Sequence, residues 1–137
     1  MKTERSIGAV VFKGKECLVL KYGMGHWGLV KGNIEKGENK NETILRELEE
    51  ETGIKEAEII DDFEEVTEYY YSFKGEKIHK TVIYLLLKVN TKEVKLSYEH
   101  DDYRWLSFNE AINQVNFDNV KNIIKKAWVH LEEYKKR

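Results

Sequence analysis

Residues 81–87, TVIYLLL, restrict the possible folds of this chain more than any other part of its sequence. A strand with one face in water alternates apolar and polar residues, whereas this run is apolar at nearly every position. Such a run is typical of a strand that is buried on both faces, which requires other elements to cover the sheet on each side. The sequence therefore predicts a central strand here, with a layer of structure on either side of it.

The other strand patterns are bounded by turn residues. Residues 7–12 and 17–22 predict two strands joined by a turn. Residues 59–73 and 78–89 predict the two arms of a long hairpin that closes at a Lys-Gly-Glu turn. Residues 103–106 predict a further short strand.

Helix signals lie between and after these strands. Asn39 with Glu42 predicts the start of a helix, and Gly53 predicts its end. Ser107 with Glu110 matches a capping box that opens a short second helix. Strands mixed with helices predict an α/β sandwich, and 137 residues predict one domain, residues 1–137. A last helix carries apolar residues at helical spacing, which predicts core packing: Phe117, Val120, Ile123, Ile124, Ala127, Trp128, Leu131 and Tyr134.

The first helix carries an acidic cluster that stability alone does not explain. Glu47, Glu50 and Glu51 are spaced i, i+3 and i+4, so their carboxylates share one face. They precede Gly53 at the negative end of the helix dipole, where an acid costs about 0.3–1 kcal/mol. A solvated acidic face is the alternative interpretation. Clustered carboxylates are, however, the ligands that Mg²⁺ and Mn²⁺ prefer, and such ions activate water and polarise phosphoryl groups.

Residues 32–54, GNIEKGENKNETILRELEEETGI, resemble the Nudix box, Gly-x5-Glu-x7-Arg-Glu-U-x-Glu-Glu-x-Gly-U with U apolar. The resemblance implies the Nudix fold, an α/β/α sandwich with a mixed sheet between helices, and a divalent metal ion on the box helix. The defined positions are Gly32, Glu38, Arg46, Glu47, Leu48, Glu50, Glu51, Gly53 and Ile54.

The resemblance also implies roles for single residues. Glu47, Glu50 and Glu51 would bind the metal, with the backbone carbonyl of Lys31 as a further ligand. Glu47 or Glu51 would act as the general base, and both assignments stay open. Arg46 would orient a box glutamate through an ion pair, and Glu38 would support it. Outside the box, Glu99 could supply another carboxylate as base or ligand.

Flanking segments are similar to those of asymmetric diadenosine tetraphosphate hydrolases. Residues 26–32 (HWGLVKG), 80–84 (KTVIY) and 99–106 (EHDDYRWL) carry this similarity. Two residues depart from the usual pattern, because Val30 replaces a proline and Asn33 replaces a histidine. The similarity implies substrate contacts, with cations or imidazoles on phosphates and tyrosines stacked on adenine: His26, Lys31, Lys80, Tyr84, His100 and Tyr103. The position of Lys80 at the start of a buried strand, with no neutralising partner evident in the sequence, favours such a role.

The resemblance implies an enzyme that hydrolyses diadenosine tetraphosphate to ATP and AMP with Mg²⁺, or alternatively Mn²⁺. The rival functions are removal of pyrophosphate from 5′-triphosphate RNA, hydrolysis of ADP-ribose or dinucleotide cofactors, and non-catalytic nucleotide sensing. A net charge of -2 does not favour a basic RNA channel. We expect a small nucleotide substrate and no membrane partner, since no apolar run approaches the roughly 18 residues needed to span a bilayer. A cytoplasmic location follows as an expectation, and the oligomeric state stays open.

Overall fold

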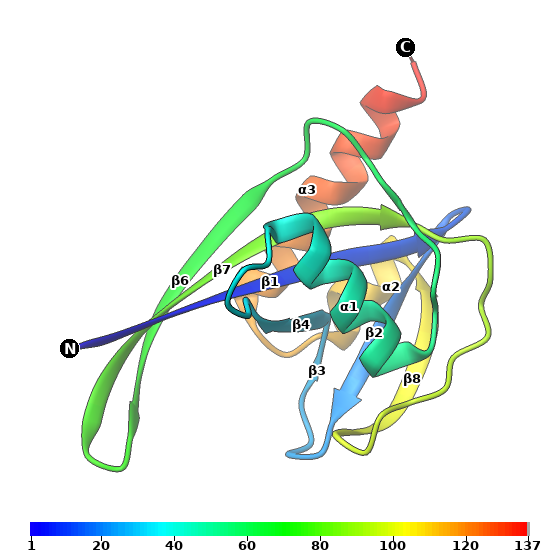
Figure 1. The fold of residues 1–137 in the computed structure, drawn as a ribbon. Coiled ribbons are helices and arrows are strands. Elements are labelled where there is room, and N and C mark those ends of the chain that lie inside the picture. The colour runs from blue at the N-terminus through cyan, green and yellow to red at the C-terminus, as the bar shows by residue number, and fades with distance from the viewer. Residues whose placement is uncertain (137) are drawn as a thin grey trace.

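The computed structural model describes residues 1–136, which form a mixed eight-stranded sheet and three helices. Helices cover both faces of the sheet, with α1 in front of it and α2 and α3 behind it in Figure 1. The elements follow in the order β1 (Lys2–Lys13), β2 (Glu16–Tyr22), β3 (Trp27–Gly28), β4 (Val30–Asn33), α1 (Lys40–Thr52), β5 (Glu58–Ile59), β6 (Glu65–Phe73), β7 (Glu76–Lys88), β8 (His100–Ser107), α2 (Phe108–Gln114) and α3 (Asp118–Tyr134).

Strand β7 lies at the centre of the sheet, as its apolar sequence predicted. It pairs in parallel with β1, and antiparallel with both β6 and β5. Its side chains alternate between two cores, with Val82 and Leu86 on the α2–α3 face and Ile83 and Leu85 on the α1 face. Burial of both faces explains why this strand shows no polar alternation.

Strand β1, next to β7, pairs with two different strands along its other edge. Its last residues pair with β2, whereas residues 6–9 pair antiparallel with β4, the strand that leads into the box loop. The other edge of β4 has no strand partner within residues 1–136.

The hairpin predicted from residues 59–73 and 78–89 is correct at its tip and wrong at its base. β6 and β7 pair from Glu65↔Tyr84 to Phe73↔Glu76, and their arm extends away from the helices in Figure 1. Residues 58–59 form the separate strand β5, which pairs with the far end of β7. The left-handed backbone of Asp62, at φ 64°, turns the chain between β5 and β6 and so ends the continuous arm.

The predicted helix ends are confirmed for α1 and α2, which both begin with capping boxes. Gly53 ends α1 in the left-handed conformation, at φ 76°. In α3 the core prediction is wrong at Phe117 and Tyr134, because both side chains are exposed. No helix within residues 1–136 combines the length and apolar character needed to cross a bilayer.

Candidate active site

The box helix lies close against β4 because residue 32 has no side chain. A Cβ atom added at Gly32 would lie 2.0 Å from the carboxyl carbon of Glu47 and within 2.3 Å of both of its oxygens. The Glu47 carboxylate therefore occupies the space that any other residue at position 32 would fill. This close approach explains why the box motif requires glycine at position 32.

Arg46 ties the box loop to the acidic face of α1. Its Nε and Nη2 atoms donate to the two oxygens of Glu38 at 2.6 and 3.0 Å. Its Nη1 atom lies 2.7 Å from Oε1 of Glu47 and 3.1 Å from Oε2 of Glu50. The hydrogen bonds from Arg46 lower the pKa of Glu38 to about 2. This geometry orients Glu47 from one side, which is the arrangement that the resemblance implied.

Glu51 points into the protein and lacks a full set of partners. Only 4% of its surface is exposed, and its Oε1 atom accepts no hydrogen bond within residues 1–136. Burial, together with the neighbouring carboxylate of Glu47, raises the pKa of Glu51 to about 10. An unpaired buried carboxyl oxygen costs about 1–3 kcal/mol, so the fold gains nothing from this residue as it stands.

His100 faces Glu51 across a gap. Its Nε2 atom also lacks a hydrogen bond in the described chain and lies 3.7 Å from Oε1 of Glu51. Ser97 contacts the other ring nitrogen, Nδ1, at 3.1 Å. Burial lowers the pKa of His100. Because its side chain is fully buried, His100 has no access to a phosphate here, contrary to the phosphate contact implied by the sequence.

A hollow of about 360 Å³ collects the carboxylates at the end of α1, and we call it the carboxylate hollow. Glu99 reaches it from the segment before β8, because Ser97 N donates to Glu51 O and Gly23 N donates to Glu99 O. The lining residues are Glu47, Glu50, Glu51, Ser97, Tyr98 and Glu99.

The residues of this hollow fit a divalent cation by their chemistry. Four carboxyl groups supply hard oxygen donors, and the unpaired Oε1 of Glu51 is an available ligand atom near the carboxylate of Glu47. Across residues 1–136, no three acidic, histidine or cysteine side chains stand ready to hold an ion together. Arg46 accounts for part of this, since it holds Glu47 and Glu50 on its guanidinium. A metal-bound arrangement therefore requires side-chain movement at the cluster.

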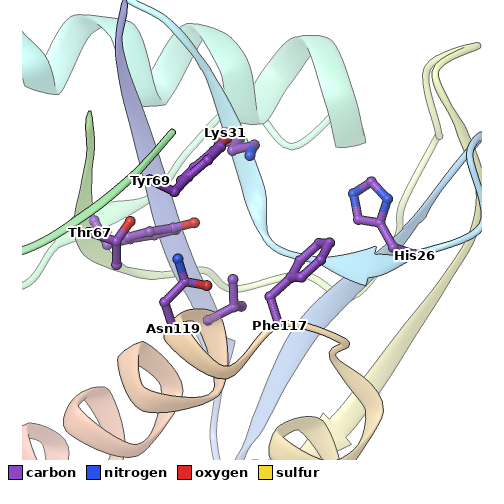
Figure 2. A pocket seen from close by; sticks show the side chains of 8 residues that line it. His26, Lys31, Thr67, Tyr69, Phe117 and Asn119 are labelled. Atoms are coloured by element: carbon purple, nitrogen blue, oxygen red, sulfur yellow. The ribbon is translucent and has the colours of Figure 1, made fainter. Parts of the chain in front are cut away.

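A second hollow of about 360 Å³ lies on the α2–α3 face, and we call it the aromatic slot. Figure 2 shows Tyr69 and Lys31 on one side of it, and Phe117 and Asn119 on the opposite side. The ammonium of Lys31 lies 5.8 Å from the centre of the Tyr69 ring. Burial lowers the pKa of Lys31, and the charge of Glu51 opposes that effect. The lining residues are His26, Lys31, Thr67, Tyr69, Tyr84, Phe117, Asn119 and Val120.

A row of rings connects the two hollows. Tyr22 stacks on His26 at 4.6 Å between ring centres and also contacts His100 at 4.6 Å, while His26 contacts Phe117 at 5.4 Å. Asn116 holds the Phe117 end in place, because its Oδ1 accepts from the backbone of β3 at 2.6 Å. Contacting side chains therefore link the slot, through His100, to Glu51 of the carboxylate hollow.

Two sequence-predicted substrate contacts lie elsewhere. Lys80 is buried, with its ammonium 3.5 Å from Glu4 and 3.1 Å from Oδ1 of Asn33. The interpretation that nothing neutralises Lys80 is therefore wrong. Tyr103 packs against the core on the α1 face, whereas Tyr84 belongs to the core on the other face. These two rings cannot hold the same base.

Five residues that line the slot were not predicted as substrate contacts: Thr67, Tyr69, Phe117, Asn119 and Val120. Phe117 was assigned to the core by its helical spacing, but it precedes α3 and is 53% exposed. Tyr69 and Thr67 share one face of β6. The alternating pattern of β6 could have marked such a face, yet it could not have shown that the face borders a hollow.

The sequence of this chain is similar to those of known proteins. The chain matches the NUDIX domain family over residues 2–128. It is 39% identical to a rat asymmetrical bis(5′-nucleosyl)-tetraphosphatase over 110 residues, which cover 77% of this chain and 71% of the relative. It is 33% identical over 101 residues to an RNA pyrophosphohydrolase of Nitratiruptor, covering 66% and 64% of the two chains.

Among solved structures, the fold is similar to that of a Caenorhabditis elegans Ap4A hydrolase in a binary complex. The TM-score is 0.82 at 29% identity, with 95% of this chain and 98% of the other covered. The predicted α/β fold, with a mixed sheet between helices, is thereby confirmed.

Proposed function

This chain belongs to the Nudix hydrolase family, and from that premise we propose that it hydrolyses diadenosine tetraphosphate asymmetrically to ATP and AMP. The observation that supports this proposal is that both hollows adjoin β4, because Lys31 of β4 lines the aromatic slot and Glu47 of the carboxylate hollow packs against Gly32. One hollow suits a nucleoside and the other suits the reacting phosphate. Mg²⁺ or Mn²⁺ as the ion and a cytoplasmic location are part of the proposal.

The aromatic slot would hold one adenosine. Tyr69 and Phe117 approach from opposite walls, so a purine can stack on either ring. Thr67 and Asn119 line the same space, and neither side chain has a hydrogen-bond partner within the described residues. Free amide and hydroxyl groups beside stacking rings are suited to the polar edge of a base.

Lys31 would bind the phosphates that leave the slot. It lines the slot from β4, the strand whose Gly32 packs against Glu47 of the carboxylate hollow. Burial lowers the pKa of Lys31, and the charge of Glu51 opposes that effect. A partly buried ammonium attracts phosphate strongly, because less water competes for it. Lys80 would contribute less, since Glu4 already offsets its charge.

Glu47, Glu50, Glu51 and Glu99, with the backbone carbonyl of Lys31, would hold the divalent ion. When bound, the ion would offset phosphate charge and lower the pKa of a water molecule. Glu47 or Glu51 would take the proton of the attacking water. The water oxygen bonds to the fourth phosphorus from the bound adenosine, and the bond from that phosphorus to its bridging oxygen breaks. Arg46 keeps Glu47 in position during this step.

Hydrolysis in water labelled with oxygen-18 tests the proposal. We expect the label in AMP and not in ATP, because the stacked base and the carboxylates set a distance at which only one phosphorus can react. Diadenosine pentaphosphate should also yield ATP as one product. Two molecules of ADP from the tetraphosphate, or label in ATP, would overturn the asymmetric assignment.

A second candidate is pyrophosphate removal from the 5′ end of RNA, which the similarity to the Nitratiruptor protein favours. The aromatic slot could hold the first base and the carboxylate hollow the terminal phosphates. Triphosphorylated RNA and diadenosine tetraphosphate should therefore be compared as substrates of the same preparation. A higher kcat/KM for the RNA would make it the preferred assignment.

A further inference from the structure

Tyr98 is an aromatic residue whose position neither the fold nor the proposed chemistry explains. Its side chain is 95% exposed, and it makes no hydrogen bond and no ring contact within residues 1–136. It lines the carboxylate hollow, where it is the only aromatic ring. An isolated exposed tyrosine has no consequence by itself, but this one lines the same hollow as Glu51, whose Oε1 atom is buried and unpaired within residues 1–136.

The backbone on both sides of Tyr98 is firmly held. Ser97 N donates to Glu51 O at 3.2 Å, and Gly23 N donates to Glu99 O at 3.0 Å. His100 N closes a turn onto Ser97 O at 3.2 Å. The exposed ring is thus carried by an ordered support, which reduces the entropy lost when a ligand stacks on it.

The proposed cleavage places the second nucleoside close to this ring. The attacked phosphorus is bonded through one oxygen to the ribose of the second adenosine. When that phosphorus lies at Glu47, Glu50 and Glu51, its nucleoside must lie beside the carboxylate hollow. The aromatic slot, at about 360 Å³, is near the lower limit for ligand sites and suits one nucleoside rather than two.

We propose that Tyr98 forms a second nucleoside subsite, in which the base of the departing AMP stacks on the exposed ring. This inference rests on the proposed function, because it requires a substrate with a nucleoside at each end. The subsite has one wall, unlike the slot between Tyr69 and Phe117. A single open face accepts any base, since every base offers a π surface.

Two substrates that differ only at the second nucleoside test the subsite. Diadenosine tetraphosphate and adenosine 5′-tetraphosphate share the first adenosine and the four phosphates, and both would be cleaved at the fourth phosphorus. Stacking on one ring predicts that Tyr98→Ala lowers kcat/KM for the dinucleotide roughly tenfold. The same change should leave kcat/KM for adenosine tetraphosphate unaltered. Tyr98→Phe should behave as the unmodified protein with both substrates.

Phe73→Ala is a matched control, because Phe73 is also an exposed aromatic ring but lies at the tip of the β6–β7 hairpin. Phe73→Ala should leave kcat/KM unaltered for both substrates. If diadenosine tetraphosphate yields ATP and AMP but Tyr98→Ala affects both substrates equally, or neither, the subsite is wrong and the proposed function stands. If the unmodified protein does not form ATP and AMP, the function fails and the subsite fails with it.

Discussion

The carboxylate hollow and the aromatic slot have similar volumes, but acidic side chains dominate the lining of the first, whereas aromatic rings dominate the lining of the second. In the carboxylate hollow, acidic side chains crowd together at the negative end of α1, and Glu51 keeps a buried oxygen without a hydrogen bond within residues 1–136. In the slot, aromatic and apolar side chains line most of the space, and the centres of the His26 and Phe117 rings lie 5.4 Å apart.

The difference separates residues kept for chemistry from residues that also support the fold. Removing a charge from the carboxylate hollow should abolish activity while making the protein more stable. Removing a ring from the slot should weaken substrate binding without such a gain. Substitutions in the two hollows can therefore test whether the contrast is real.

The largest effect is expected for Glu51→Gln. Loss of the buried carboxylate should lower kcat by more than the roughly 10–100-fold that loss of an outer-shell partner costs. The thermal midpoint of the metal-free protein should rise at the same time, because glutamine is buried without the proton uptake that the raised pKa of Glu51 requires. Turnover assays and thermal denaturation measure the two outcomes. Retention of more than about a tenth of the activity, ~1.4 kcal/mol of barrier, would exclude Glu51 as a metal ligand or base.

Gly32→Ala should have the next largest effect, since it displaces the carboxylate of Glu47 without altering any charge. The added methyl group would lie 2.0 Å from the carboxyl carbon. A shift of about 1 Å at a reacting group can lower the rate about a hundredfold, so we expect kcat/KM to fall tenfold or more. Gly23→Ala serves as the control, because its Cβ would meet only the carbonyl of Glu99 at 3.6 Å. Equal activity of the two variants would contradict the importance of this close approach.

A smaller effect, confined to binding, is expected in the slot. Phe117→Ala should raise KM for diadenosine tetraphosphate by a factor that corresponds to about 1–3 kcal/mol of stacking, and leave kcat nearly unchanged. Because Phe117 is exposed, its loss should cost little stability. Tyr103→Ala should do the reverse, lowering the thermal midpoint without raising KM, since its ring packs on the other face. A KM increase for Tyr103→Ala would restore this residue to the substrate site.

The smallest expected effect is a pH dependence of stability in the metal-free protein. The folded state raises the pKa of Glu51 from 4.5 to about 10, so it binds one more proton than the unfolded chain between these values. Stability must therefore fall as the pH rises through this window. Urea denaturation of the unmodified protein and of Glu51→Gln should give free energies of unfolding that diverge progressively as the pH rises above 4.5. Parallel curves would show that Glu51 is not strained by burial.

The sequence by itself determined the features that depend on neighbours along the chain. The acidic face of α1 follows from the spacing of its glutamates, and its ends follow from Asn39 and Gly53, all within one short segment. The double-sided burial of β7 follows from its composition alone. These local patterns were sufficient for the fold class and for the carboxylates of the box.

Only the tertiary structure decided which distant residues meet. Tyr69 and Phe117 come from β6 and from the residue before α3, and their facing positions depend on strand register and helix packing. The same holds for the partner of Lys80, because Glu4 reaches it only through the parallel pairing of β1 with β7. A shift of one residue in register moves a side chain to the opposite face of a sheet. For that reason no local pattern could place Tyr84 and Tyr103 on different faces or reveal the aromatic slot.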